Sequence, residues 1–403
     1  MRDASSPLAG LVVLDFTRVL AGPYCTRLLA DLGARVIKIE RPGEGDEMRR
    51  GLLQLEEGRD DQSTYFVRCN AGKESVALDL GRPEARPIIQ DLARVSDVVV
   101  ENFVPGVAAR LGCDYQTLSG ARSDLVYCSI SGYGQTGPWR ARPAFAHLIH
   151  AASGMMHLEQ GQEEPAPRPA NLQAADVLAG THAFGAILAA LWRRARTGHG
   201  ARVDVSMLES LVAADDVTFG SVLNGGEELH APRPGMLVQE IGGRYLALQT
   251  AGAAEIWRRL AALMGQPELY SEPHFATPQA RRVHWPELRD IISRWLKRFT
   301  TVDEAVEVLT AARVPCAAVL SPTEVVALPQ LEERRFFPSV PHPARGRVRV
   351  PGTPFQLDGR SLGPSGPAPY RVGEHTRIVL EGLLGYPPSQ VTDLLALGVA
   401  QAP

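Results

Sequence analysis

The chain has 403 residues, a length that predicts two domains. Of these residues, 45% are hydrophobic and 22% are charged, a composition typical of a folded globular protein. Its net charge of -3 gives no reason to expect a nucleic-acid partner or binding to an anionic membrane. The five cysteines include no C-x-x-C spacing, which indicates reduced thiols in a cytoplasmic protein rather than disulfides or zinc.

The first 205 residues alternate short β-rich runs with helical patterns. Strands are predicted at 11–16, 35–40, 75–80, 97–103, 125–131 and from 202, with helices at 22–32 and 83–95. This alternation predicts an α/β fold with a mostly parallel sheet and helices on both of its faces. The longest apolar stretch, 177–192, has 16 residues. It is too short to span a bilayer and predicts a buried helix.

The pattern changes after residue 210. Residues 211–235 end in a Pro- and Gly-rich segment and predict a linker. Residues 236–325 predict a smaller α+β domain that opens with a hairpin turning at Gly242 and Gly243. A second linker at 326–345 leads to residues 346–403, whose terminal helices are expected to dock on the large domain begun by residues 1–210.

A glycine-rich loop, "SISGYGQTGPW" at 129–139, follows one of the predicted strands. Gly132, Gly134 and Gly137 have the spacing of a dinucleotide-binding fingerprint, which requires a helix directly after the third glycine. Here the chain continues into "PWRARPAF", whose prolines leave no room for that helix. The favoured interpretation is a turn whose glycines need positive φ, with a different kind of nucleotide still possible as ligand.

Asp176 stands where the long apolar helix is expected to begin. One interpretation is a helix N-cap, a position that aspartate favours strongly. The other is a carboxylate kept ionised in an apolar pocket by the helix N-terminus, which is a nucleophile able to form acyl intermediates. The residue pattern leaves both interpretations open.

Other polar residues carry weaker signals. His147 and His150 share one helical face and His157 follows, but no cysteine or carboxylate lies at ligand spacing nearby, so no metal site is predicted. Packing or surface placement is the main interpretation of these histidines. Three residues at strand edges are interpreted first as turn-forming polar residues: Asn70, Lys73 and Asn102.

Several blocks of the sequence occur together and in a fixed order. They are "LAGLVVLDFTRVLAGPYCTRLLADLGARVIKIERPGEGDEMR", "YFVRCNAGKESVALDL", "DVVVENFVPG", "LVYCSISGYGQTGPW", "AASGMM" and "ADVLAGTHAFGAILAALWRRARTGHGARVDVSMLES". In this order they resemble the class III CoA-transferases, a group that includes formyl-CoA:oxalate and carnitine CoA-transferases and the 2-methylacyl-CoA racemases. The terminal "GEHTRIVLEGLLGY" also resembles the end of the family, so the resemblance is nearly full-length.

The resemblance implies a Rossmann-like large domain built from both chain ends, a small domain between them, and two chains interlocked as a homodimer. It implies an enzyme that moves CoA from an acyl-CoA donor to a small carboxylic acid through aspartyl anhydride and aspartyl-CoA thioester intermediates. Acyl-CoA is then a substrate, with no tightly bound cofactor and no metal. Asp176 matches the catalytic aspartate of the family. The positions that match its CoA contacts are Val19, Arg41, Leu78, Asn102, Arg110 and Arg142.

The chain departs from the family pattern at three places. Val104 replaces a basic residue that members often have there, so one phosphate contact is in doubt. Formyl-CoA transferases carry a glycine run where "APRPGMLVQE" has only Gly235, which argues against oxalate as acceptor. The racemases have Gly-His-Asp where this chain has 144–146 as Ala-Phe-Ala. The racemase alternative therefore lacks one of its two acid–base groups.

Overall fold

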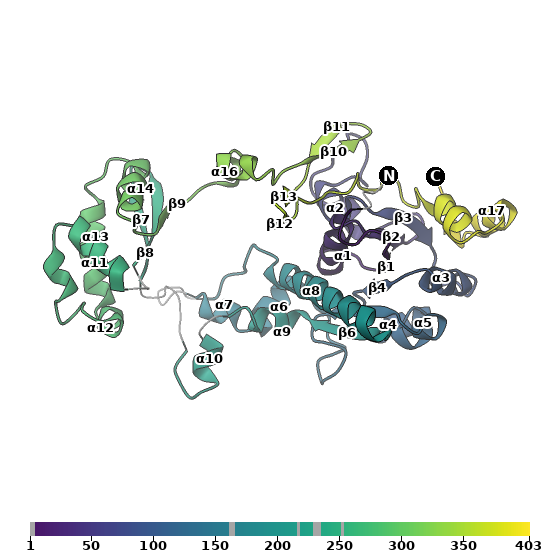
Figure 1. Ribbon diagram of the computed structural model, residues 1–403, viewed down its shortest axis with the longest axis horizontal. Coiled ribbons are helices and arrows are strands. Elements are labelled where there is room, and N and C mark those ends of the chain that lie inside the picture. Colours follow the sequence, from purple (N-terminus) through teal and green to yellow (C-terminus); the bar gives the residue numbers. More distant parts are fainter. Residues whose placement is uncertain (1–4, 161–165, 216–217, 229–234, 251–253) are drawn as a thin grey trace. The chain divides into compact units, whose positions relative to one another are not determined.

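The computed structural model describes residues 5–160, 166–215, 218–228, 235–250 and 254–403 (Figure 1). It divides into two compact units, a larger one of 1–156, 169–224 and 329–403 and a smaller one of 157–168 and 225–328. Within the expected linker 211–235, residues 216–217 and 229–234 lie outside the described part of the chain. Each unit has its own apolar core.

A seven-stranded sheet forms the centre of the larger unit. Its strands, in spatial order, are β14 (Ala400–Gln401), β3 (Glu74–Leu78), β2 (Arg35–Glu40), β1 (Val12–Asp15), β4 (Val98–Glu101), β5 (Val126–Ser131) and β6 (Ala201–Ser206). All neighbours pair in parallel except β14, which is antiparallel to β3. The predicted α/β class with a mostly parallel sheet is confirmed. The order 3-2-1-4-5-6 is that of doubly wound sheets.

Successive residues of a strand point to opposite faces of the sheet. Apolar side chains therefore form a core on each face, and helices cover both. Val13 belongs to one core and Leu14 to the other. The core of Val13 contains residues of α1 (Ala21–Asp31), α6 (Ala146–Ala152), α8 (Ala174–Thr197) and α9 (Met207–Val212). The core of Leu14 contains residues of α3 (Ala85–Arg94), α4 (Val107–Leu111), α5 (Tyr115–Ala121), the π-helix η3 (Ile378–Leu383) and α17 (Pro388–Ala396).

The end of the chain thus returns to the sheet that its beginning forms, as the yellow and purple segments show (Figure 1). Val379, Leu380 and Val391 are fully buried in the same core as Leu14. Because β14 also adds to the edge of β3, the C-terminal residues complete the larger unit.

Helix α8 is longer than the apolar stretch of the sequence. It has 24 residues, and by length and composition alone it could cross a membrane. Here Ala175, Ala179, Ala183 and Ile187 pack into the core at intervals of four residues, the spacing of one helical face. The opposite face is exposed, with Trp192 at 68%. The predicted buried helix is therefore buried on one side only.

The smaller unit has a three-stranded antiparallel sheet of β7 (Met236–Ile241), β8 (Arg244–Gln249) and β9 (Cys316–Ala318). The predicted hairpin is present, with Gly242 and Gly243 at φ 58° and 79°. Its helices are α11 (Ala254–Leu263), η2 (Pro267–Tyr270), α12 (Pro278–Val283), α13 (Trp285–Leu296), α14 (Val302–Ala311) and α15 (Pro322–Val326).

The remaining helices and strands are short, and most belong to the larger unit. They are η1 (Glu47–Arg50), α2 (Thr64–Asn70), α7 (Met155–Leu158), α10 (Thr218–Val222), α16 (Pro329–Glu333), β10 (Ser339–His342), β11 (Gly346–Arg349), β12 (Gln356–Leu357) and β13 (Arg360–Ser361).

Candidate active site

Two cavities open where the strand order of the sheet reverses, between β1 and β4. Ligands of doubly wound sheets bind outside the carboxyl ends of the strands at this point. The loop 16–20, which joins β1 to α1, and the segment that follows β4 contribute to both cavities. The cavity volumes are about 400 Å³ and about 320 Å³.

Most residues proposed from the resemblance lie around these two cavities. The smaller cavity, which we call the Asp176 cavity, is lined by Val19, Asn102, Arg142 and Asp176 among others. The larger is lined by Arg41 and Leu78 among others. Arg18, Glu47 and Phe103 line both. Arg110 is an exposed residue of α4 and is not among the residues that line either cavity.

Asp176 is the third residue of α8 and not its N-cap. The N-cap position is occupied by Gln173, whose side chain makes no capping hydrogen bond. The N-cap interpretation of Asp176 is therefore wrong. The backbone N–H groups of Ala21, the first residue of α1, and of Asp176 itself instead lie near the carboxylate and favour its ionised form. The carboxylate therefore lies near the N-terminus of α1 as well as in the first turn of α8.

The surroundings of Asp176 favour its protonated form. Burial raises the pKa of Asp176 to about 6, although the N–H groups of Ala21 and Asp176 and the nearby His147 act in the opposite direction. The carboxylate is half-buried. An incompletely hydrated carboxylate that is still mostly ionised at neutral pH is suited to nucleophilic attack.

Gly180 allows α8 to approach α1 closely enough for this contact. It lies one turn after Asp176 and therefore on the same helical face. A Cβ atom at Gly180 would lie 2.5 Å from the carbonyl oxygen of Ala21 and 3.1 Å from Cδ1 of Tyr24. Since the first of these neighbours is backbone, any larger residue would push the helices apart.

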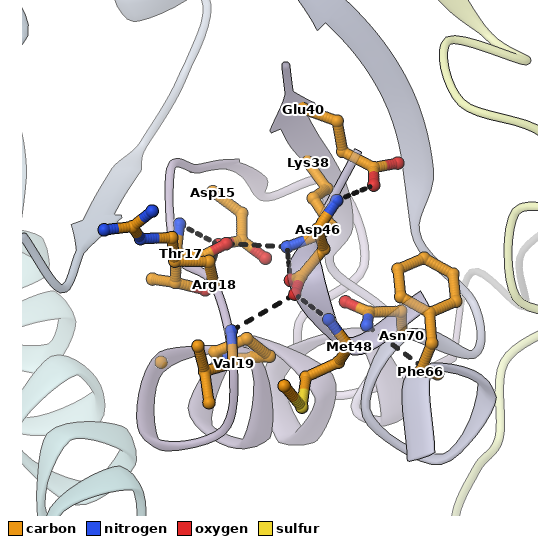
Figure 2. Close-up of polar contacts among 12 residues, drawn as sticks. Asp15, Thr17, Arg18, Val19, Lys38, Glu40, Asp46, Met48, Phe66 and Asn70 are labelled. Carbon is orange, nitrogen blue, oxygen red and sulfur yellow. Dashed lines mark hydrogen bonds and ion pairs between the residues drawn. The ribbon is translucent and has the colours of Figure 1, made fainter. Parts of the chain in front are cut away.

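The wall of the Asp176 cavity includes a residue in an unusual conformation. Val19 has φ 68°, a left-handed value that is costly for a β-branched side chain. Oδ1 of Asp46 accepts the N–H of Val19 at 3.3 Å and the N–H of Met48 at 2.9 Å; both contacts are drawn in Figure 2. Lys38 pairs with Asp46 at 2.8 Å and donates to the Thr17 carbonyl at 2.6 Å. These contacts hold the strained loop in place.

The opposite side of the same loop is held by Asn102. Its Oδ1 accepts the N–H of Arg18 at 2.9 Å, and its Nδ2 donates to the carbonyl of Arg18 at 2.8 Å. The loop after β1 is therefore tied to the end of β4 across the strand reversal.

Buried charges below this loop form two further groups. Lys73 donates to Asp15 at 3.1 Å and to Oδ1 of Asn70 at 2.9 Å. Burial opposes ionisation of Asp15, but Lys73 and Lys38 outweigh it and lower the pKa of that carboxyl. Asn70 and Lys73 are buried. They also flank a turn in which the N–H of Lys73 donates to the carbonyl of Asn70 at 3.3 Å, so the expected turn is present.

Glu40 and Arg49 form the second group. The Arg49 guanidinium donates to both carboxylate oxygens of Glu40, at 2.8 and 2.7 Å. Burial alone would raise the pKa of Glu40, but the charge and hydrogen bonds of Arg49 lower it to about 2. Glu40 also accepts the N–H of Asp46 at 2.9 Å (Figure 2), which connects this pair to the loop that carries Val19.

These buried charges were not predicted, although the sequence carries a signal for them. Asp15, Lys38 and Glu40 interrupt the apolar strands predicted at 11–16 and 35–40. Strands of a parallel sheet are covered on both faces, and charged side chains are rarely buried unless they are paired. A charge inside such a strand therefore predicts a buried ion pair.

The glycine-rich loop has the turn conformation expected from its sequence. Gly134 and Gly137 both have φ 85°. No helix follows directly, because α6 begins only at Ala146, so the dinucleotide fingerprint is not formed. Gly132 lines the Asp176 cavity, and a Cβ atom there would overlap the side chain of Ala144.

The histidines have different environments. His147 is exposed, whereas His150 is fully buried and its Nε2 accepts the N–H of Ala175 at 3.2 Å. His157 faces Glu228 at 3.1 Å in the smaller unit.

The segment "APRPGMLVQE", compared above with a glycine run, has residues 231–234 outside the described part of the chain.

One group of metal-ligand side chains occurs among the described residues, in the smaller unit: His274, His284 and Glu287. The two imidazole rings are stacked, with centroids 3.9 Å apart and planes 5° from parallel. A metal ion binds in the plane of an imidazole at about 2 Å. One ion cannot lie in both of these planes, so the arrangement does not form a metal site.

The strand order, the two cavities at the reversal and the carboxylate between two helix N-termini define an α/β protein with a ligand site at the carboxyl edge of its sheet. Comparison with known proteins then identifies its family. The chain belongs to CoA-transferase family III, whose sequence model matches residues 8–376, and is an enzyme of the class III acyl-CoA:carboxylate CoA-transferase family.

Its relatives include succinyl-CoA:glutarate CoA-transferase of Mus musculus, 33% identical over 99% of this chain and 91% of that protein. Formyl-CoA:oxalate CoA-transferase of Streptomyces coelicolor is 33% identical over 97% of this chain and 98% of that protein. The solved structure of a CaiB/BaiF family protein from Brucella suis is 28% identical, with a TM-score of 0.79 over 94% of this chain and 99% of that chain. The resemblance read from the sequence is thereby confirmed.

Proposed function

We propose that this enzyme transfers CoA from an acyl-CoA donor to a small carboxylic acid and that Asp176 is its covalent nucleophile. The observation that carries the proposal is the half-buried carboxylate of Asp176, with a pKa raised to about 6. It lies in the same cavity as Val19, Asn102 and Arg142, three positions at which family members are expected to contact CoA.

The reaction proceeds through four acyl exchanges. A carboxylate oxygen of Asp176 attacks the donor thioester, the C–S bond breaks, and CoA leaves as its thiolate while a mixed anhydride forms. The thiolate then attacks the aspartyl carbon of the anhydride, which releases the donor acid and forms an aspartyl-CoA thioester. The acceptor carboxylate displaces the thiolate again, giving a second anhydride. The thiolate finally attacks the acceptor carbon, which releases the new acyl-CoA and the free carboxylate of Asp176.

The environment of Asp176 supports these steps. At neutral pH a carboxyl group with a pKa of about 6 is mostly ionised. The N–H of Ala21 orients the carboxylate and stabilises charge on it as the anhydride forms and breaks. Water would hydrolyse both anhydrides, so partial burial of the side chain also protects the intermediates.

Binding of CoA is proposed along the two cavities. Arg41 and Leu78 extend the site from the Asp176 cavity into the larger one. The amide of Asn102 is occupied by the backbone of Arg18, so Asn102 acts on CoA by shaping the loop. The contact of Arg110 rests on the resemblance alone. Acyl-CoA binds as a substrate, so no tightly bound cofactor is proposed.

The names of the relatives support a dicarboxylic acid as acceptor, since they pair succinyl-CoA with glutarate and formyl-CoA with oxalate. The absence of a glycine run before Gly235 favours the longer acid.

A Rossmann-like large domain in an interlocked homodimer remains part of the proposal. The exposed face of α8, with Trp192 68% exposed, supports contact with a second copy. Five free thiols support a cytoplasmic location.

The test is substitution of Asp176 combined with detection of the intermediate. Asp176→Ala should fold and bind CoA, while transfer measured with a panel of acyl-CoA donors and free acids falls by several orders of magnitude. Wild-type protein incubated with acyl-CoA alone should carry an adduct mass on the peptide of Asp176, and hydroxylamine should remove it. A fully active Asp176→Ala variant, or an adduct on a cysteine, would exclude this mechanism.

A further inference from the structure

The first turn of α8, which carries Asp176, is held by a side chain from another helix. The first N–H groups of a helix have no partner within it. In α8 the N–H of Ala174 donates to the carbonyl of Leu172 at 2.9 Å. The next N–H, that of Ala175, donates to Nε2 of His150 at 3.2 Å. His150 belongs to α6 and has no solvent exposure.

We infer that His150 is a positioning residue of this enzyme, which acts as the N-terminal cap of α8 and thereby fixes the location of Asp176. The inference rests on the proposed role of Asp176 as nucleophile. Gln173 provides no side-chain cap, so the imidazole supplies from α6 what an N-cap residue normally supplies from within the helix. Ala175 directly precedes Asp176, and a displaced first turn displaces the nucleophile.

The hydrogen bond also sets the protonation state of His150. An imidazole nitrogen accepts a hydrogen bond only when it carries no proton, so the ring is the neutral tautomer with its proton on Nδ1. An imidazolium would lose this bond and place a positive charge at the positive end of the helix dipole. His150 therefore acts as a hydrogen-bond acceptor toward the first turn of α8.

Three variants test the inference. His150→Leu fills a similar space but accepts no hydrogen bond, and His150→Gln restores an acceptor oxygen. Ile187→Ala is the matched control, because Ile187 is fully buried in the same helix about three turns beyond Asp176. For each variant we measure the melting temperature, the affinity for CoA and the rate of the Asp176 adduct in a single turnover with acyl-CoA.

We expect His150→Leu to bind CoA like the wild type but to form the adduct about 10- to 100-fold more slowly, because the reacting oxygen is misplaced. His150→Gln should recover most of this rate. Ile187→Ala should lose thermal stability and keep the rate. Equal rates for His150→Leu and the wild type, or a folded His150→Gln as slow as His150→Leu, overturn the inference. If His150→Leu does not fold, His150→Gln decides by itself: a folded His150→Gln protein that forms the adduct slowly overturns the inference.

The pH dependence of adduct formation separates positioning from a general loss of stability. In the wild type its acidic limb should follow the Asp176 pKa of about 6. In His150→Leu a loosened first turn exposes the carboxylate, so the limb should move to lower pH, whereas in Ile187→Ala it should not move. The other ionisable groups near Asp176 are His147 and Tyr65 and, around the cavity, Arg18, Glu47, Arg140 and Arg142.

Failure of the proposed function would give a different result. If Asp176→Ala retains transfer, the nucleophile is misassigned whatever the His150 variants do. If Asp176→Ala is inactive while His150→Leu forms the adduct at the wild-type rate, the nucleophile is correct and only the positioning role is wrong.

Discussion

The side-chain amide of Asn102 binds both backbone groups of Arg18, accepting its N–H at 2.9 Å and donating to its carbonyl at 2.8 Å. The two residues are 84 positions apart and lie at the ends of β4 and β1, on either side of the strand reversal. Since Arg18 precedes the strained Val19, this pair of hydrogen bonds holds the loop from one side while Asp46 holds it from the other.

Substitution of Asn102 should weaken CoA binding through this loop. Asn102→Ala leaves two backbone groups of Arg18 without their partner, and we expect about a tenfold weaker affinity for CoA. Asn102→Asp should not restore it, because the carboxylate accepts the N–H but repels the carbonyl. Calorimetric titration with CoA measures the effect. Asn224→Ala is the control, since in the described part of the chain that amide donates to the carbonyl of Gly220, an exposed residue of α10. Unchanged affinity in Asn102→Ala would contradict the role of the clamp.

Gly180→Ala should separate α8 from α1. The added Cβ would meet the Ala21 carbonyl at 2.5 Å, and we expect a loss of roughly 1 to 3 kcal/mol in the free energy of unfolding together with reduced transfer. Gly185→Ala is the matched control in the same helix, where a Cβ would meet nothing within 4 Å. It should be neutral or stabilising. Denaturant unfolding and steady-state rates measure both variants, and equal behaviour of the two would show that the close approach is unimportant.

Ionisation of Asp176 should cost stability at neutral pH. Its pKa is about 6 in the folded protein against a usual value of 3.8, so the folded state binds the proton more tightly than the unfolded state does. Ionisation of Asp176 therefore lowers the free energy of unfolding. The loss is complete above pH 6, amounts to roughly 2 to 3 kcal/mol, and disappears as the pH falls below about 4.

Asp176→Asn, which is uncharged at every pH, should therefore melt at a higher temperature than the wild type at pH 8 and at the same temperature near pH 4. Calorimetry at the two pH values measures the difference, with the exposed Asp60→Asn as control. A stability difference that does not change with pH would show that the carboxylate is not destabilised by its surroundings.

Glu40→Gln should be strongly destabilising because it leaves the Arg49 guanidinium buried without a counter-charge. Both side chains have no exposure, and we expect a loss of about 3 to 5 kcal/mol at pH 7. The pKa of Glu40 is about 2 when folded and 4.5 otherwise. Its ionisation thus stabilises the protein above pH 4.5, and this contribution is lost as the pH falls towards 2.

Urea unfolding at pH 7 measures the loss. Glu255→Gln breaks an exposed pair with Arg258 on α11 and serves as the control, which should behave like the wild type. A Glu40→Gln protein as stable as this control would mean that Arg49 finds another counter-charge.

The enzyme should not exchange the α-proton of a 2-methylacyl-CoA. The position at which the racemases have a histidine is occupied by Phe145, which lines the Asp176 cavity and offers no acid–base group. Incubation in heavy water followed by mass spectrometry measures the exchange, and transfer activity of the same sample shows that the enzyme is active. Deuterium uptake at Cα at turnover rates would instead support the racemase alternative.

The sequence by itself determined the fold class, the family and the local positions of the candidate residues. Alternating apolar runs and helical patterns predicted a mostly parallel α/β sheet, because those periodicities arise from local geometry and from burial of an element's own face. The glycine spacing predicted a positive-φ turn for the same local reason. Asp176 could be placed at the start of a helix, but its chemical environment could not be read.

Only the tertiary structure decided what these residues contact. The carboxylate of Asp176 meets the N–H of Ala21, and His150 caps a helix that begins 24 residues later. Lys73 reaches Asp15 across 58 positions. Periodicity reports that a side chain is buried but not which distant group it meets. The pKa of a buried group is set by those neighbours, so the chemistry of the site exists only once the strands and helices have packed together.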